Sequence, residues 1–411
     1  MTTKGALKAY ALSAIFGALG GLVTIGVVVA LDHLMSFVWK TGFGVNPDAP
    51  TRSLMVFPVL FLVGAIIGVL VRRSGKVDGL DAVMTQVLTT GSINWRHLPR
   101  ALVMAVLSLG SGASLGPEAP ASVASVSLAS FAAEKTKANA TDTQTMNVSA
   151  MSGMLGGMMN SPFMVPAMIA ESVQKKLAEI NPLLVCSMIS SAFGVGAMVV
   201  VLGKVFSIDL GVPPSDGANL TSLLWAFLFG IAGAVGGVLV FLMGKRVTNP
   251  LMAKLHSPVT KALVAALFMA LVAYAFPLTM FSGQHTVPQL IGETAQLTAL
   301  YLIVIALAKM LATTVLIEGG FFGGPIFPAI FAGVAFGLAF DHLFGVSLTI
   351  AVPAAVGGLL TLVQQKPFTA ALLTVGIVGT TTAPITALGV AGGLIVLLAL
   401  KNLQQKQTAK A

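Results

Sequence analysis

Two glycine- and proline-rich segments interrupt long apolar runs of the chain, and they constrain its fold more than any other feature. Residues 110–120 read GSGASLGPEAP, and residues 318–328, about half a chain later, read EGGFFGGPIFP. Aligned on each other, the segments share paired residues: Gly116 with Gly324, Pro117 with Pro325, and Pro120 with Pro328. Two related broken helices are typical of membrane transporters built from internal repeats, whose transport site lies where the breaks meet.

The composition places these breaks in a membrane. Of 411 residues, 56% are hydrophobic and 9% are charged, which is too little polar surface to cover a soluble globule. Residues 9–31, 54–71 and 223–244 are each long enough to span a hydrocarbon core. Their apolar runs are continuous rather than alternating, which disfavours a β-barrel. The sequence predicts an all-α, multi-pass integral membrane protein.

The chain is predicted to form a single membrane domain over residues 1–411. Its repeat halves are expected at 1–210 and 211–400, because residues 204–219 form the longest polar connection. Residues 401–411 are a polar tail, and we expect no soluble regulatory domain at either end.

Charge and cysteine content exclude several classes of function. The net charge is +9, but the bases lie in pairs between apolar runs, as at Arg72 and Arg73 or Lys245 and Arg246, which is typical of cytoplasmic loops rather than of a nucleic-acid patch. The single cysteine, Cys186, excludes an intrachain disulfide and a cysteine-based metal site. We expect no cofactor, no metal site and no enzymatic activity, since neither a phosphate-binding loop nor a nucleophile–base pair stands out.

The breaks are predicted to attract an anion. A helix start leaves backbone N–H groups without partners and carries a partial positive charge, so it binds an anion well. Gly116 and Gly324 allow close approach of the backbone, and Pro117 and Pro325 suit a first helical turn. Helices that start at these two prolines are predicted to share one anion site near the membrane midplane.

Glu118, directly after the first proline, is the predicted gate. When ionised, its carboxylate can occupy the place of the anion, and when protonated it can leave. The alternative is a carboxylate that merely stabilises the start of its helix. Its position between glycines, prolines and apolar runs favours the gate.

These motifs resemble a known family. Residues 115–120 (LGPEAP) resemble the Gly-Arg-Glu-Gly-Pro signature of the CLC chloride channels and proton–chloride antiporters, and residues 323–328 (GGPIFP) resemble that family's Gly-Gly-x-Phe-x-Pro signature. Residues 160–162 (NSP), followed by Glu171, are similar to its Asn-Ala-Pro stretch before an internal acidic pair. The resemblance covers roughly residues 54–400, and it is strongest to a short bacterial subgroup of ion-transport proteins with Leu-Gly-Pro-Glu.

The resemblance implies a CLC-type fold of two inverted repeats and a homodimer with one pore per subunit. It also implies a place in the bacterial inner membrane, with cytoplasmic termini and the lipid bilayer as surroundings. Glu118 would then be the external gating glutamate. The backbone N–H groups that would line the anion sites are those of Glu118, Ala119, Ile326 and Phe327.

Several positions depart from the family pattern. The arginine before the gating glutamate is Pro117 here, and the following glycine is Ala119. The family serine that touches the central anion would fall near residues 74–81, where Ser74 is the sole serine and the match is poor.

The internal proton-transfer glutamate of the family would fall at Ser172. Glu171 lies one residue earlier and is a candidate replacement, although a shift of one residue turns a side chain by about 100° around a helix. Capping, or pairing with Lys175, is the alternative role for Glu171. Lys309, within an apolar span, is expected to snorkel or to neutralise an acid.

Taken together, the sequence predicts transport of anions, chloride first among them, by a CLC-type channel or proton-coupled antiporter. Ser172 weakens the case for proton coupling without removing it. Two alternatives remain open: a fluoride-selective transporter, and a membrane scaffold of the same fold that has lost transport.

Overall fold

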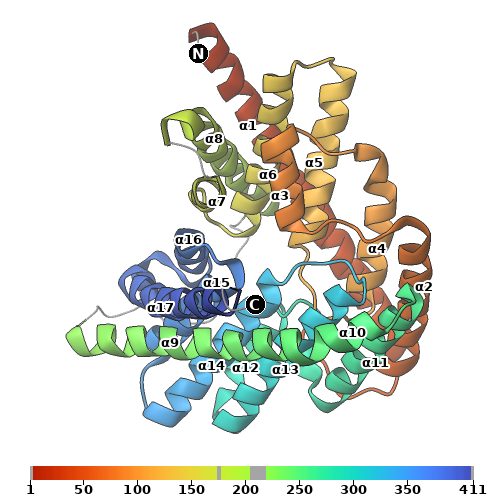
Figure 1. The fold of residues 1–411 in the computed structure, drawn as a ribbon, viewed down its shortest axis with the longest axis vertical. Coiled ribbons are helices and arrows are strands. Elements are labelled where there is room, and N and C mark those ends of the chain that lie inside the picture. The colour runs from red at the N-terminus through yellow and green to blue at the C-terminus, as the bar shows by residue number, and fades with distance from the viewer. Residues whose placement is uncertain (1–2, 174–176, 204–218, 409–411) are drawn as a thin grey trace.

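The computed structural model describes residues 3–173, 177–203 and 219–408, and these are almost entirely helical (Figure 1). The first half contains α1 (Thr3–Met35), α2 (Val56–Ser74), α3 (Leu80–Thr90), α4 (Leu98–Gly110), α5 (Glu118–Lys135), α6 (Ala140–Met158), α7 (Met164–Ser172) and α8 (Leu177–Leu202). The second contains α9 (Leu220–Met243), α10 (Asn249–Lys254), α11 (Pro258–Ala275), α12 (Thr286–Gly292), α13 (Ala299–Glu318), α14 (Ile326–Phe344), α15 (Leu348–Gln364), α16 (Pro367–Val378) and α17 (Ala383–Thr408).

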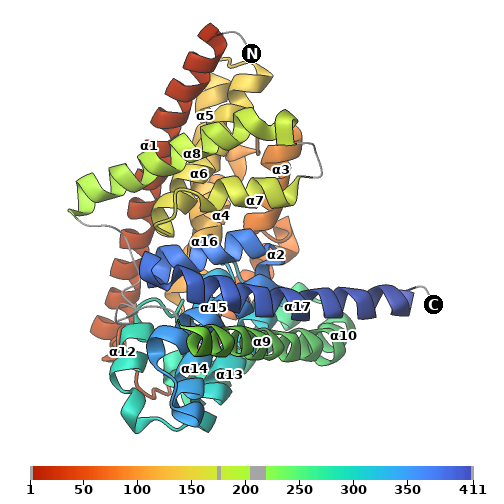
Figure 2. The same ribbon diagram turned by 90° about the vertical axis from the view of Figure 1, so that its left-hand side faces the viewer.

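The two halves repeat one packing pattern. In the first, α1, α6 and α8 pack against one another, and α5 packs against α6. In the second, α9, α15 and α17 pack against one another, and α14 packs against α15. The starts of α5 and α14 are in contact through Glu118 and Ile326, and Figures 1 and 2 show α5 in the upper part of the molecule and α14 in the lower part, so the two helices run in opposite directions. The predicted fold of two inverted repeats is confirmed, while the predicted boundary at residues 210 and 211 lies outside the described residues.

Glycines at the three-helix junction of each half explain the close packing. A methyl group on Gly153 of α6 would lie 2.0 Å from the carbonyl oxygen of Gly17 on α1. In the second half, a methyl group on Gly358 of α15 would lie 2.1 Å from the carbonyl oxygen of Gly230 on α9. Small residues let membrane helices approach to backbone contact, so these positions fix the matching geometry of the halves.

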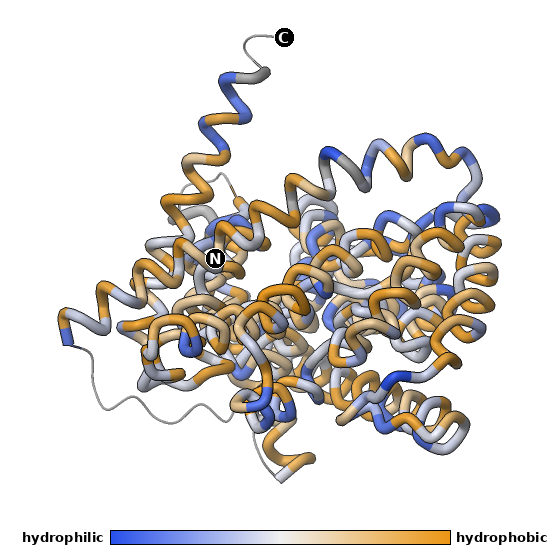
Figure 3. Tube along the Cα trace, turned by 90° about the horizontal axis from the view of Figure 1, so that it is seen from below, coloured by the Kyte–Doolittle hydropathy of each residue, from blue (hydrophilic) through white to orange (hydrophobic). Residues whose placement is uncertain are grey.

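Eight helices of the described residues are long and apolar enough to cross a membrane: Thr3–Thr41, Val56–Ser74, Asn181–Leu202, Leu220–Val240, Pro258–Ala275, Ala299–Glu318, Ile326–Phe344 and Thr380–Lys406. Their outer faces are apolar; Val200 is 84% exposed and Leu300 is 71% exposed. Figure 3 shows hydrophobic residues along the peripheral helices as well as in the interior. Such a surface suits lipid rather than water, as the sequence predicts for a multi-pass membrane protein.

Candidate functional site

The two breaks touch each other at the centre of the molecule. The first lies between α4 and α5, and the second between α13 and α14. Gly116 N–H donates to the carbonyl oxygen of Gly324 at 2.7 Å, and Gly324 N–H donates back to Gly116 at 2.9 Å. This isolated antiparallel bridge joins the two repeats backbone to backbone.

Each break turns at a glycine with a left-handed backbone. Gly112 has φ of +82° and Gly320 has φ of +94°, and the two glycines occupy equivalent positions in the repeats. A residue with a side chain rarely adopts this conformation, which explains why the same glycine appears in both segments.

Glu118, the first residue of α5, reaches across to the second repeat. It is completely buried, and its Oε1 accepts the N–H of Ile326, the first residue of α14, at 2.7 Å. The backbone amides of Glu118 itself and of Phe327 also interact favourably with the carboxylate. The carboxylate therefore lies at the starts of both broken helices, where a helix N-terminus favours negative charge.

The paired glycines make room for this carboxylate. A methyl group on Gly116 would lie 2.0 Å from Glu118 Oε2, and one on Gly324 would lie 2.1 Å from Oε1. The structure thus brings together most of the predicted site residues, namely Gly116, Glu118, Gly324, Ile326 and Phe327. Ala119 follows in the first turn of α5 and is also buried. Their role as anion ligands stays a prediction.

One oxygen of the Glu118 carboxylate lacks a hydrogen-bond donor among the described residues. Glu118 Oε2 is buried, and it accepts no hydrogen bond from the described residues. A buried acceptor of this kind is costly unless a proton or a water satisfies it.

Polar contacts between the halves hold the breaks in place. Ser108 of α4 accepts the N–H of Phe322 in the second break at 2.8 Å. In the opposite direction, the Thr313 hydroxyl of α13 donates to the carbonyl oxygen of Ser114 in the first break at 2.8 Å. Sequence reasoning missed both residues, since a serine or threonine in an apolar helix carries no sign of its distant partner.

Trp39, just beyond α1, supports the first break. Its side chain is completely buried, and Nε1–H donates to the carbonyl oxygen of Gly110, the last residue of α4, at 2.9 Å. That carbonyl group is one of those that a helix end leaves without an intrahelical partner.

Lys309 differs from its expected role. It is completely buried and does not snorkel, and within the described residues it forms no ion pair with an acid. Instead its Nζ donates to the carbonyl oxygens of Thr279, Met280 and Phe281 at 2.9, 3.3 and 3.0 Å. The expectation is wrong because three carbonyl groups match the three N–H bonds of an ammonium group. Phe281 in turn donates its N–H to Gly112 in the first break at 3.1 Å.

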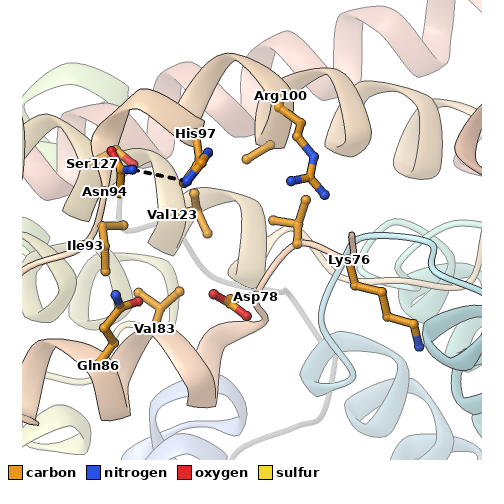
Figure 4. Close-up of a pocket in the computed structure, with 12 residues that line it drawn as sticks. Lys76, Asp78, Val83, Gln86, Ile93, Asn94, His97, Arg100, Val123 and Ser127 are labelled. Atoms are coloured by element: carbon orange, nitrogen blue, oxygen red, sulfur yellow. Dashed lines mark hydrogen bonds between the residues drawn. The ribbon is translucent and has the colours of Figure 1, made fainter. Parts of the chain in front are cut away.

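Ser74 lies apart from the breaks as the exposed last residue of α2. The loop after it lines a cavity of about 260 Å³ with Gln86, His97 and Arg100 (Figure 4). Figure 4 shows Asp78 within this group and Lys76 directed away from it. Lys76 Nζ donates to the carbonyl oxygen of Glu318 at 3.0 Å and so anchors the loop to the end of α13. An anion contact at Ser74 stays a prediction.

Glu171 caps a helix of the other repeat. Its carboxylate accepts the N–H groups of Phe368 and Thr369 at 2.8 and 2.9 Å, and the Thr369 hydroxyl at 2.6 Å. These donors belong to the first turn of α16, so Glu171 supplies the negative charge that a helix N-terminus favours.

Ser172, the other residue of the predicted proton path, bonds within its own helix. Its hydroxyl donates to the carbonyl oxygen of Met168, one turn earlier in α7, at 2.6 Å. Lys175, the predicted alternative partner of Glu171, lies outside the described residues. A proton path through Glu171 and Ser172 stays a prediction.

Comparison with known proteins agrees with this architecture. The model of the voltage-gated chloride channel family matches residues 59–397. The "Putative ion-transport protein YfeO" of Shigella flexneri is 26% identical over 374 residues, covering 89% of this chain and 87% of its own. The protein of the same name from Escherichia fergusonii gives the same values.

Two solved structures share the fold. A CLC-type fluoride/proton antiporter superposes with a TM-score of 0.75 over 96% of each chain, at 17% identity. A slow cyanobacterial Cl⁻/H⁺ antiporter superposes with a TM-score of 0.79 over 98% of each chain, at 19% identity. Since the family model covers most of the sequence, the chain belongs to the voltage-gated chloride channel family, the CLC proteins.

Proposed function

We propose that this protein exchanges small anions for protons across the membrane, with chloride as its main substrate. The observation that carries the proposal is the carboxylate of Glu118, held by the Ile326 N–H between the starts of α5 and α14. A negative group already lies where two helix N-termini converge, and an anion of similar size would be stabilised there by the same amides.

Glu118 acts as the gate through a change of charge. While ionised, it holds the Ile326 N–H and competes with the transported anion. A proton on Oε2, the oxygen that has no donor among the described residues, removes that charge. The helix N-termini then attract the Glu118 side chain less strongly. The neutral side chain then swings aside, and an anion takes its place.

The amides bind the anion without a fixed countercharge at the site. Pro117 stands where the family carries an arginine, so attraction comes from backbone dipoles alone. Weak, multiple contacts of this kind favour release as well as entry.

Proton coupling is supported by the solved relatives, since both are described as proton antiporters. On the internal side, Glu171 is engaged by α16, so we propose that it positions this helix rather than carrying protons.

Fluoride is the second candidate substrate. One solved relative is described as a fluoride/proton antiporter, and Ser74, the predicted central contact, lies exposed at a helix end. Backbone amides can donate hydrogen bonds to either halide, so a site formed by them does not by itself select chloride over fluoride.

We also propose that the protein works as a homodimer in the bacterial inner membrane. The relatives named above come from Shigella and Escherichia. Exposed apolar side chains on α8 and α17, such as Phe193 and Ile395, provide a surface for a second copy. Cross-linking through cysteines placed at these two positions in membranes tests the assembly.

Ion efflux from proteoliposomes tests the function. Vesicles loaded with chloride or fluoride are diluted into a buffer that contains an impermeant anion. The released ion is measured with an electrode selective for chloride or for fluoride. Faster efflux of chloride supports the proposal, and faster efflux of fluoride supports the second candidate. If neither ion leaves, the protein is a scaffold without transport.

A further inference from the structure

A histidine between two carboxylates lies near the start of α12. His285 Nε2 is 3.1 Å from Asp32 Oδ1 of α1, and Nδ1 is 3.3 Å from Asp48 Oδ1 in the loop after α1. Both ring nitrogens therefore face acceptors, an arrangement that suits the protonated ring, in which both nitrogens are donors.

This cluster is open to water. It lines a cavity of about 350 Å³ together with His33 of α1, and Asp48 is 68% exposed. Protons from solvent therefore have direct access to the imidazole ring.

A narrow crevice continues from the cluster toward the gate. Asp32 and Met35 line both cavities, and Pro117, the residue before Glu118, also lines the second one. The crevice also has polar lining from Ser282 and Gln284, and its volume of about 10 Å³ is on the order of the room one water requires.

Next to Pro117, Glu118 Oε2 is a buried acceptor with no donor among the described residues. Beside the crevice, the Gln284 amide lies against His285, 2.8 Å from Nε2. Because the protonated ring donates from Nε2, the amide oxygen rather than its nitrogen faces the ring. A water in the crevice would supply the donor that Glu118 Oε2 lacks.

The charged neighbours of His285 favour its protonated form. Burial opposes the charge, but the hydrogen bond to Asp32 and the charges of Asp32 and Asp48 outweigh it and raise the pKa of His285 above its ordinary value. Histidine is the side chain best matched to proton transfer at physiological pH.

We infer that His285 and Asp32 form a proton relay that delivers protons from solvent to Glu118. The inference rests on the proposed function, because a relay has a purpose only where protons accompany anions.

The relay transfers one proton in three steps. The Nε2–H bond of the imidazolium breaks as an O–H bond forms on Asp32. The proton then passes through a water in the crevice to Glu118 Oε2, which leaves Asp32 ionised. Neutral His285 keeps its Nδ1–H bond beside Asp48, and a new N–H bond forms at Nε2 with a proton from water of the open cavity.

The rate of proton-coupled anion exchange by the His285→Ala variant tests the relay. The variant is expected to exchange roughly a hundredfold more slowly than wild type near neutral pH, the lower end of what a proton-transfer group contributes. The loss is expected to shrink as the pH falls, since protons then reach Glu118 from water. His33→Gln is the matched control, because His33 lines the same cavity but bonds to the carbonyl oxygen of Val29 in its own helix.

A Glu118→Gln background separates proton delivery from structural damage. Glu118→Gln needs no proton to carry anions, so adding His285→Ala is expected to leave its anion flux unchanged. An equal slowing in that background would overturn the relay, as would wild-type exchange by His285→Ala at all pH values. Asp32→Asn provides a second variant with the same expected pattern. If wild type itself moves neither chloride nor fluoride, the proposed function fails first, and the relay is rejected with it.

Discussion

Glu118 Oε1 lies 2.7 Å from the backbone nitrogen of Ile326, and these two residues occupy equivalent positions in the two broken segments. One repeat thus supplies the negative group, and the other supplies the helix start that receives it. The proposed gate lies where the two halves meet, so substitutions at this contact are expected to alter transport more than those elsewhere.

Gly324→Ala is expected to abolish gating by Glu118. The added methyl group would lie 2.1 Å from Oε1, so the carboxylate cannot take its place on Ile326. Overpacking of this kind costs about 1–3 kcal/mol of stability. Anion efflux and thermal unfolding measure the two effects. Gly196→Ala is the control, because a methyl group there meets nothing within 4 Å; wild-type exchange by Gly324→Ala would count against the site.

Lys309→Met is expected to destabilise the fold by about 2–4 kcal/mol, because three buried carbonyl groups lose their donor. Met310→Leu, one residue along the same helix, keeps the volume and is expected to cost less than about 1.5 kcal/mol. Thermal unfolding in detergent compares the two variants. Equal melting temperatures for Lys309→Met and wild type would show that the ammonium group is dispensable.

Glu171→Gln is expected to keep the ratio of protons to anions while lowering stability by about 1–3 kcal/mol, because the carboxylate is a cap for α16. Hydrogen exchange at the start of α16 should become faster. Loss of proton movement with anion flux intact would instead assign Glu171 to the proton path.

Stability should depend on pH through His285. Its pKa is raised in the folded protein, so the protonated ring stabilises the fold fully below the ordinary histidine value of about 6.5. That contribution is lost as the pH rises through the raised value. Melting temperatures of wild type and His285→Gln are expected to differ most at acid pH and to converge at alkaline pH. A constant difference would contradict the ion cluster.

Local chemistry made the centre of the site predictable. A glycine that lets the backbone approach closely, a proline in a first helical turn and an acid beside them have the same structural meaning in any helix break. Gly116, Gly324 and Glu118 could therefore be singled out before their contacts were known, and long apolar runs gave the membrane spans in the same way.

Partners that are distant in sequence were not predictable. Glu171 contacts Thr369, 198 residues away, and His285 contacts Asp32, 253 residues away. Lys309 was assigned the wrong surroundings, because its partners are main-chain carbonyl groups, which any residue supplies. Such contacts depend on how the halves pack, and no local pattern records them.

Proton and anion movement by Glu118→Gln, measured together in proteoliposomes beside wild type, tests the central claim most directly. Glutamine resembles a permanently protonated glutamate, since it carries no charge. Wild type is predicted to move protons against chloride, and the variant is predicted to pass chloride with no proton movement. Proton-coupled exchange that survives in Glu118→Gln would contradict the account, because the gate would then lie at another residue.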